Sequence, residues 1–180
     1  MALTEIVTTN RLSLPLWTAA DVAMLRGQGR RADWHPDFPR EDDRDAASMW
    51  HEGDPWGPRS IVLDGVVVGS MGFFGPPGPA SDGAPEAEVG YGLVEEARGA
   101  GLATEALTAM VAAAEATGTR VRASVLPENA ASIRVLAKCG FTELRGSNED
   151  GELVLVRPLP SVIEDAIETA KAQTCQREGE

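Results

Sequence analysis

A strand that runs through a glycine-rich turn into a helix is the feature of this sequence that most limits its fold. Residues 88–94 are rich in β-branched, aromatic and glycine residues, which is typical of a strand. Residues 98–101 then carry almost no side chains beyond Arg98. From Leu102 onward the apolar residues recur at helical spacing and include Leu107, Met110, Val111 and Ala114. The backbone is therefore nearly bare where the helix is expected to begin.

Bare N–H groups at the start of a helix bind anions, because the first turn has unpaired donors and the helix dipole places positive charge there. We therefore expect residues 98–104 to hold a phosphorylated ligand. A nucleoside-triphosphate P-loop is excluded, since Gly101 is not followed by Lys and Ser or Thr. A dinucleotide-binding turn is a weak alternative, with Thr104 in place of Gly or Ala and Glu128 as its acidic residue. The pyrophosphate of coenzyme A is the third option.

Two motifs in sequence order favour coenzyme A. The pattern Arg98-x-x-Gly101-x-Ala103 resembles the Arg/Gln-x-x-Gly-x-Gly/Ala signature of the GNAT acetyltransferase superfamily. A strand-like run and then residues 127–141 follow it, and they resemble the second motif of that family, in which Asn129 opens a short helix that ends in Gly-Phe. The chain is identified as a member of this family on the pair of motifs, because a Gly-x-Gly turn alone is a weak signal.

The start of the chain, residues 9–18, is similar to the opening strand of the ribosomal-protein N-terminal acetyltransferase (RimJ/RimL-type) subgroup. The resemblance covers residues 9–159. It implies an α+β fold with α/β-type layering: one GNAT-like domain over residues 1–160, with a mixed, mainly antiparallel central sheet flanked by helices. We expect residues 161–180 to form an exposed helix or a disordered tail.

Local patterns predict the elements of this domain. Asp64-Gly65 between two apolar runs indicates a hairpin, and Thr18 is placed to cap a helix. The prolines and glycines of residues 75–85 predict a mobile loop. We expect strands at 11–16, 60–63, 66–71, 88–94, 121–126, 141–144 and 153–157, and helices at 18–25, 43–50, from 102, and 130–139.

Composition narrows the class of partner. The net charge of −12, with 16 basic residues spread along the chain, argues against nucleic acid. No apolar run is long enough to span a membrane, and we expect no secretory signal, because no basic-then-apolar stretch occurs. Two cysteines and two histidines predict no metal cluster and no disulfide framework. We expect a cytoplasmic protein without a metal, whose acidic surface favours cationic amine acceptors.

Acetyl transfer from a thioester to an amine needs a base for the amine, stabilisation of the oxyanion, and a proton for the departing thiolate. Glu88 is the predicted base, because it enters the strand that leads to the phosphate turn and because the family often has a glutamate there. Its alternative role is that of a partly exposed strand residue or a salt-bridge partner. Glu86, two residues away on the same face, is a weaker candidate.

The sequence identifies the general acid, which would protonate the departing thiolate, less clearly than the base. Many GNAT enzymes carry a tyrosine in the helix of the second motif, and the position that corresponds to it here is Leu136, which has no proton to donate. The only tyrosine, Tyr91, lies in the predicted strand. The resemblance to the ribosomal-protein subgroup implies Ser132 as the catalytic acid, although an ordinary serine in the first turn of a helix fits equally well. The missing tyrosine leaves open a protein that binds coenzyme A with little or no catalysis.

The resemblance implies that coenzyme A lies along the predicted strand, the glycine turn and the second helix. Asn129 is also a natural helix cap. Arg98 could contact a phosphate oxygen or fold over the surface, and Arg134 could reach the adenosine phosphate or be solvated. The nucleotide-dependent oxidoreductase that a dinucleotide turn would imply is a remote alternative. The predicted cofactor-binding residues are Val89, Gly90, Tyr91, Arg98, Gly99, Ala100, Gly101, Leu102, Ala103, Thr104, Asn129 and Arg134.

The acceptor pocket is expected from residues 29–56 and 75–85, on the family layout. The first segment concentrates Trp34, Phe38, Trp50 and Trp56, and its aspartates would suit a cation, although its arginines offset them. An α-amine, with a pKa near 8, is easier to deprotonate than lysine. We therefore predict an acetyl-CoA-dependent N-acetyltransferase acting on a peptide α-amine or a small amine, and a homodimer is compatible with the family.

Overall fold

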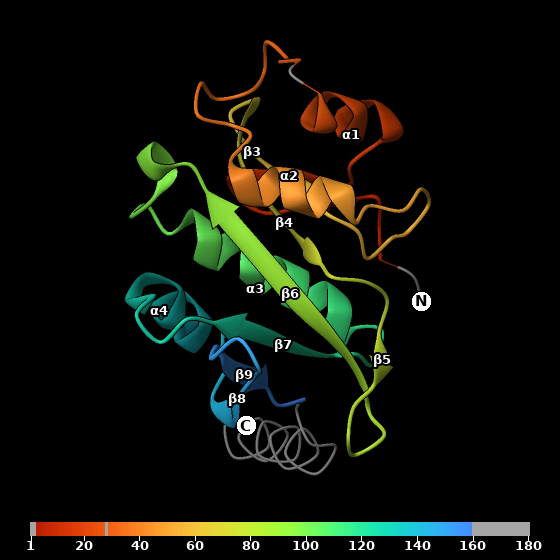
Figure 1. Ribbon diagram of the computed structural model, residues 1–180, viewed down its shortest axis with the longest axis vertical. Helices are drawn as coiled ribbons and strands as arrows, with labels where there is room; N and C mark the ends of the chain where they lie inside the picture. Colours follow the sequence, from red (N-terminus) through yellow and green to blue (C-terminus); the bar gives the residue numbers. More distant parts are fainter. Residues whose placement is uncertain (1–2, 28, 160–180) are drawn as a thin grey trace, which may run out of the picture.

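A computed structural model describes residues 3–27 and 29–159 of the chain (Figure 1). Within them, nine strands are described, and eight of them follow one another in a single sheet, in the order β1-β2-β3-β4-β6-β7-β9-β8. A ninth, β5 (Gly78–Pro79), pairs with β6 off this path. The strands are β1 (Ile6–Thr8), β2 (Leu12–Pro15), β3 (Arg59–Leu63), β4 (Val66–Phe73), β6 (Pro85–Leu93), β7 (Arg120–Val125), β8 (Glu143–Ser147) and β9 (Leu153–Arg157).

The helices begin where the sequence supplies a cap. Thr18 and Asp21 form a capping box at the start of α1 (Ala19–Arg26). The Asn129 side chain caps α4 (Ala130–Lys138). The remaining helices are α2 (Glu41–Ser48), α3 (Leu102–Glu115) and the short 3₁₀ helix η1 (Glu95–Ala97).

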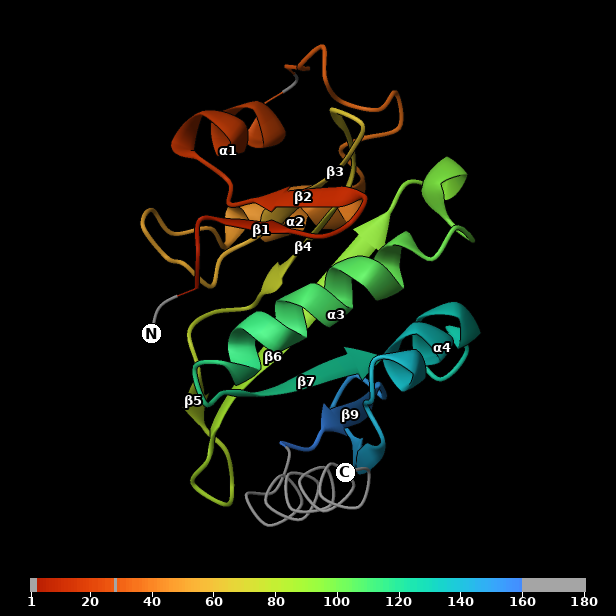
Figure 2. The ribbon, with the colours of Figure 1, turned by 180° about the vertical axis from the view of Figure 1, so that it is seen from behind.

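All the pairings along the sheet are antiparallel except that of β6 with β7. Those two strands are in register only from Glu86 opposite Arg120 to Glu88 opposite Arg122. Past this point they diverge, and α4 lies where they have separated (Figure 1). Seen from behind, α3 runs along β6 and β7 on the opposite face from α2 (Figure 2). The predicted α+β fold with a mixed, mainly antiparallel sheet is confirmed.

The core forms between α3 and the sheet. The four apolar residues that the helical spacing singled out are all buried: Leu107, Met110, Val111 and Ala114. They pack in one hydrophobic cluster with strand residues such as Val89 and Ala123. Burying this face of α3 against the sheet holds the start of the helix beside the end of β6, which places the glycine turn.

The hairpin of β3 and β4 forms as predicted. Asp64 and Gly65 both adopt positive φ, at 49° and 81°, as a tight hairpin turn requires. The strands extend two residues further along β4, to Phe73, and one residue earlier along β3, to Arg59.

The structure corrects several expectations. The strand expected at 88–94 is β6, which begins at Pro85, so Glu88 lies within the strand and not at its entry. The helix expected at 43–50 is α2, which ends at Ser48.

Residues 75–85 are not a loop throughout, because β5 pairs with β6, and Asp82 forms an ion pair of 2.7 Å with Arg120. The strand expected at 141–144 begins at Glu143 instead, since Phe141 is buried in the core. The strand β1 was not expected. The tail expected at 161–180, and Cys175 within it, lie outside the described residues.

Burial of Arg59 explains how β1 is held. Its guanidinium is fully buried and donates hydrogen bonds to the backbone carbonyls of Thr4, Glu5, Leu14 and Pro55. Burial lowers the pKa of this arginine from its usual value. No helix in residues 3–27 and 29–159 is long and apolar enough to cross a bilayer.

Candidate active site

The edge of β6 that faces β7 is open beyond Glu88. The Glu88 carbonyl accepts a hydrogen bond of 3.0 Å from the Phe74 N–H on the β4 side. Residues next to each other in a strand direct their peptide groups to opposite sides, so Val89 and Tyr91 direct theirs away from β4. Because β7 has already diverged there, this edge can accept an extended ligand as an additional strand.

The glycine turn follows directly from this open edge. Gly99 and Gly101 have φ values of 81° and 78°, in the left-handed region that favours glycine. A Cβ on Gly99 would meet no atom within 4 Å, so the turn is open to solvent. Gly101 is the N-cap of α3 and has no side chain to cap it. The first N–H groups of α3 are therefore available to an anion, as the sequence predicted.

Arg11 and Glu105 brace the start of α3. The Arg11 Nε lies 2.6 Å from a carboxylate oxygen of Glu105, and an Arg11 Nη donates to the Ala100 carbonyl at 3.1 Å. The Thr9 hydroxyl also donates to Glu105 at 2.6 Å, and this bond is the main reason that the pKa of Glu105 lies below its usual value. The only acidic residue in the first turn of α3 is thus turned toward a cation.

The two predicted phosphate-contacting arginines have different settings. Arg98 is exposed, and its Nε donates to the Leu93 carbonyl at 3.2 Å, at the end of β6. This bond folds the side chain back along its own turn. Arg134 is exposed on α4. No ion pair to either arginine occurs among residues 3–27 and 29–159.

A pocket of about 930 Å³ adjoins the open edge of β6. It brings together the predicted catalytic residues Glu88 and Ser132 with four of the predicted coenzyme residues, which are Val89, Gly90, Tyr91 and Asn129. Leu136 of the α4 region also lines it. The pocket does not include the turn residues 98–104, which lie past the end of β6.

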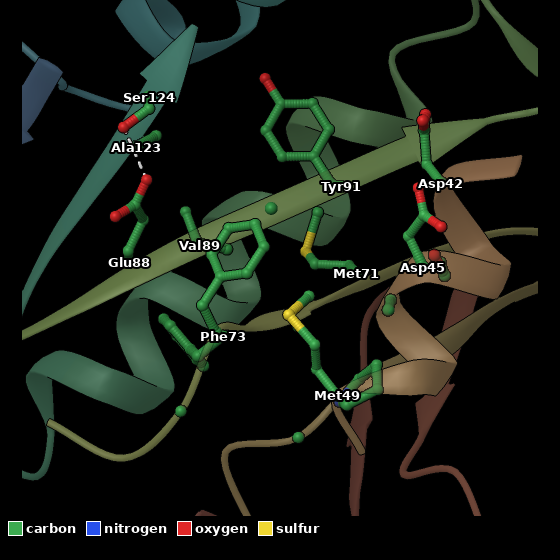
Figure 3. A pocket seen from close by; sticks show the side chains of 18 of the residues that line it. Asp42, Asp45, Met49, Met71, Phe73, Glu88, Val89, Tyr91, Ala123 and Ser124 are labelled. Carbon is green, nitrogen blue, oxygen red and sulfur yellow. Dashed lines mark hydrogen bonds between the residues drawn. The ribbon is translucent and has the colours of Figure 1, made fainter. Parts of the chain in front are cut away.

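Glu88 lines the pocket and has two partners, of which Figure 3 shows Ser124. One of its carboxylate oxygens accepts a hydrogen bond of 2.6 Å from the Ser124 hydroxyl of β7, and the other lies 2.8 Å from an Arg122 nitrogen. The Glu88 side chain keeps 21% of its surface exposed. It is therefore held in one orientation and still reaches the pocket, so both of its predicted roles find a place in the geometry.

Glu86, the weaker candidate for the base, is enclosed by arginines. It lies 2.6 Å from Arg120, 2.8 Å from Arg145 and 3.9 Å from Arg122, and only 9% of its side chain is exposed. It does not line the pocket. This arrangement favours Glu88 over Glu86 as a proton acceptor.

The first turn of α4 presents Ser132 to the pocket. The Asn129 side chain accepts a hydrogen bond of 3.1 Å from the Ser132 N–H. Asn129 therefore acts as the helix cap that the sequence predicted, and it also lines the pocket. Leu136, one turn later, is buried and lines the pocket.

Tyr91 reaches from β6 to α4. Its hydroxyl donates to the Ser132 carbonyl at 3.4 Å. Burial raises the pKa of Tyr91 to about 12, so that its phenol is protonated at neutral pH. The sequence placed Tyr91 in the strand and among the coenzyme-binding residues, and in the structure Tyr91 lines the pocket.

The opposite wall of the pocket comes from α2 and the residues after it. Of the predicted aromatic residues, Trp50 lines the pocket, whereas Trp34 and Phe38 pack edge to face in the core. Trp56 packs against Phe73. From the segment 75–85 only Gly75 and Pro76 reach the pocket.

Several lining residues were not anticipated. They come from β4 and β7, whose alternating apolar pattern would have identified them only if the strand order were known. These residues include Ser70, Met71, Phe73, Ala123, Ser124 and Val125.

Cys139 is a core residue. It is 3% exposed, and burial raises the pKa of its thiol. No group of three or more potential metal ligands occurs in the described part of the chain.

Comparison with known proteins bears on this site. The family model of the acetyltransferase (GNAT) domain matches residues 11–142. No curated protein matches the chain.

Three solved structures illustrate the likeness in fold. A GnaT-family acetyltransferase from Bordetella pertussis is 26% identical, with a TM-score of 0.57, over 86% of this chain and 100% of that one. RimJ from Mycobacterium smegmatis, in complex with a CoA-disulfide, is 24% identical, with a TM-score of 0.54, over 84% and 86%. RimL, a ribosomal L7/L12 α-N-protein acetyltransferase in complex with coenzyme A, is 19% identical, with a TM-score of 0.61, over 86% and 98%.

Proposed function

Because the chain belongs to the GNAT acetyltransferase family, we propose that it binds acetyl-CoA and transfers the acetyl group directly to a primary amine. The proposed acetyltransferase unit is residues 1–160. The acceptor is a peptide α-amine or a small-molecule amine.

The open edge of β6 carries this proposal. The Val89 carbonyl and the peptide groups of Tyr91 face away from β4, past the last residue pair with β7. They suit the amides of the pantetheine arm, which would extend β6 as a further strand. The turn from Gly99 to Gly101 lies at the end of the same edge, where bare N–H groups suit the pyrophosphate. RimJ and RimL, which share the fold, are bound to coenzyme A in their structures.

Remaining coenzyme contacts are assigned to the residues around this path. Arg98, Leu102, Ala103 and Thr104 continue the turn into α3. Asn129 lies beside the arm, and Arg134, which is exposed on α4, supplies a positive charge.

We assign Glu88 as the general base. The amine nitrogen attacks the thioester carbonyl carbon and gives up a proton to the Glu88 carboxylate, directly or through a water molecule. The hydrogen bond from Ser124 and the contact with Arg122 hold that carboxylate at the pocket. An α-amine, with a pKa near 8, demands less of such a base than a lysine with a pKa near 10.4.

Collapse of the tetrahedral intermediate breaks the carbon–sulfur bond and leaves the coenzyme thiolate. Ser132, on the first turn of α4, is the proposed donor of the proton to that sulfur, and solvent replaces the proton on its hydroxyl. A thiol with a pKa near 8.5 is a modest leaving group, so a weak acid suffices.

The first test is titration calorimetry with acetyl-CoA, followed by thiol release with a panel of peptide N-termini, lysine peptides and small amines. Binding of acetyl-CoA with thiol release by any of these amines is the expected result. If the protein does not bind acetyl-CoA, the proposed function is wrong.

A second candidate is a coenzyme A-binding protein with little or no catalysis. Leu136 favours it, because this buried residue stands at the position where the resemblance to the family implies an acidic tyrosine. Tight binding of acetyl-CoA with no thiol release across the whole panel would support this alternative.

A further inference from the structure

The charges that line the pocket are unequal. Five carboxylate side chains line it, and Arg40 is the one arginine that does so in the described part of the chain. The carboxylates are those of Asp42, Asp45, Asp54, Glu88 and Glu152.

The positive charge of Arg40 is already compensated. Two of its nitrogens lie 2.6 and 3.0 Å from the carboxylate oxygens of Asp43. Asp43 is completely buried and also accepts a hydrogen bond of 2.5 Å from the Ser70 hydroxyl. The third Arg40 nitrogen lies 3.6 Å from a carboxylate oxygen of Asp42, whose side chain is 83% exposed. Arg40 therefore compensates Asp43 and part of the charge of Asp42, and it forms no ion pair with the other four carboxylates of the pocket.

The other arginines near α2 do not reach the pocket. Arg30 donates to backbone carbonyls of its own loop, and Arg31 pairs with two aspartates that do not line the pocket. Arg44 donates to the Pro39 carbonyl. The arginines that offset the aspartates in the sequence are thus engaged elsewhere in the fold.

The two ends of the pocket are acidic and its middle is apolar. Asp42 and Asp45 lie on one side, on α2, and Glu88 lies on the other, with Met49, Met71 and Phe73 between them (Figure 3). Met49 is 53% exposed, which leaves apolar surface uncovered in the pocket. Asp45, at the far end, forms no ion pair among residues 3–27 and 29–159.

We infer that the acceptor is a primary amine that carries a second positive charge at the other end of an apolar chain. This inference rests on the proposed acetyl transfer. The reacting amine lies near Glu88, the apolar chain covers Met49 and Phe73, and the second cation lies against Asp42 and Asp45. The carboxylates of Asp42 and Asp45 attract the second positive charge of the acceptor, which favours such a molecule over an amine whose other end is neutral.

The test compares straight-chain diamines with monoamines of the same length, over a series of lengths, with the coenzyme A-bound protein. We expect the best diamine to bind at least tenfold more tightly than its matched monoamine in calorimetry, and this preference to shrink as salt is added. Equal affinities at every chain length would overturn the inference. Thiol release in the same series is a separate measure of acetyl transfer. If the protein preferred diamines in binding but released no thiol, the result would contradict the proposed function and leave the inference about the acceptor standing.

Variants locate the preference. The double change Asp42→Asn with Asp45→Asn should reduce the diamine-to-monoamine ratio about tenfold. Asp64→Asn, in the exposed β3–β4 turn outside the pocket, is the matched control and should leave the ratio unchanged. A ratio that survives the double change would place the second charge elsewhere and overturn the assignment. Peptides with a basic side chain near the N-terminus also carry two positive charges. Measuring their affinities beside those of the diamines shows whether a peptide or a small diamine binds this pocket more tightly.

Discussion

The hydroxyl of Tyr91 and the backbone carbonyl of Ser132 lie 3.4 Å apart, across the space that opens between β6 and β7. This contact joins β6 to the first turn of α4. At 3.4 Å it is a long hydrogen bond, so a bound ligand can replace it at little cost. The buried phenol also makes Tyr91 a reporter of the site.

Alkaline titration should reveal the burial of Tyr91. It is the only tyrosine in the chain, so the ultraviolet absorbance of the ionised phenol reports one group. We expect a midpoint near pH 12 in the folded protein, against about 10 in denaturant. A folded-state midpoint of 10 would contradict the described position of the side chain.

Because the pKa of Tyr91 is raised in the folded protein, the free energy of unfolding should fall at high pH. Between pH 10 and 12 the unfolded chain loses the phenolic proton while the folded protein keeps it. The contribution of Tyr91 is therefore complete below pH 10 and is lost as the pH rises toward 12. Chemical unfolding at a series of pH values should show this loss in the wild type, and Tyr91→Phe should remove that component.

Glu88→Gln should retain acetyl-CoA binding and lower the rate of thiol release by about 100-fold or more. The loss should be greatest at low pH, where fewer acceptor molecules are neutral. Glu86→Gln is the matched change on the same strand; it removes a partner of Arg120 and Arg145 and should lower the free energy of unfolding rather than the rate. Wild-type turnover of Glu88→Gln at every pH would leave Glu88 a structural partner of Arg122.

Gly101→Glu should abolish binding of acetyl-CoA, because it places a carboxylate at the bare start of α3. Gly118→Glu is the matched control. Gly118 has a φ of 80°, close to the 78° of Gly101, and lies beyond the other end of α3. Both variants bear similar backbone strain, so calorimetry should show lost affinity in the first and retained affinity in the second. Equal affinities would contradict the placement of the pyrophosphate.

Gly92→Ala should destabilise the protein by about 1–3 kcal/mol. A Cβ at this position would lie 1.8 Å from an Arg40 nitrogen, and Asp43 holds that guanidinium in place. Gly78→Ala, where a Cβ meets no atom within 4 Å, is the control and should change stability little. Denaturant unfolding measures both, and equal stabilities would show that Arg40 moves aside at no cost.

The elements that the sequence predicted well are those specified by neighbouring residues. The helical spacing of α3, the Asn129 cap of α4 and the Asp64-Gly65 turn each act over a few positions, and all three occur in the structure. For the same reason Glu88 and Ser132, chosen from motifs, both line one pocket.

Features that depend on distant residues could not be predicted in this way. Arg40 is 52 positions from Gly92, and nothing local to either one indicates that the guanidinium packs against the glycine. The segment 75–85 is rich in proline and glycine, yet Asp82 pairs with Arg120 across the sheet. The neutral pair of Arg40 and Asp43 likewise became visible only once α2 was placed against Ser70.

The open edge of β6 has a consequence for the protein before any acceptor arrives. Unpaired strand edges are templates for association with other chains, and a pantetheine arm on Val89 and Tyr91 would shield this one. A ligand that binds only the folded state stabilises it by about 2.7 kcal/mol at 100 times its dissociation constant. Acetyl-CoA bound along this edge would then stabilise the folded protein as well as supply the acetyl group.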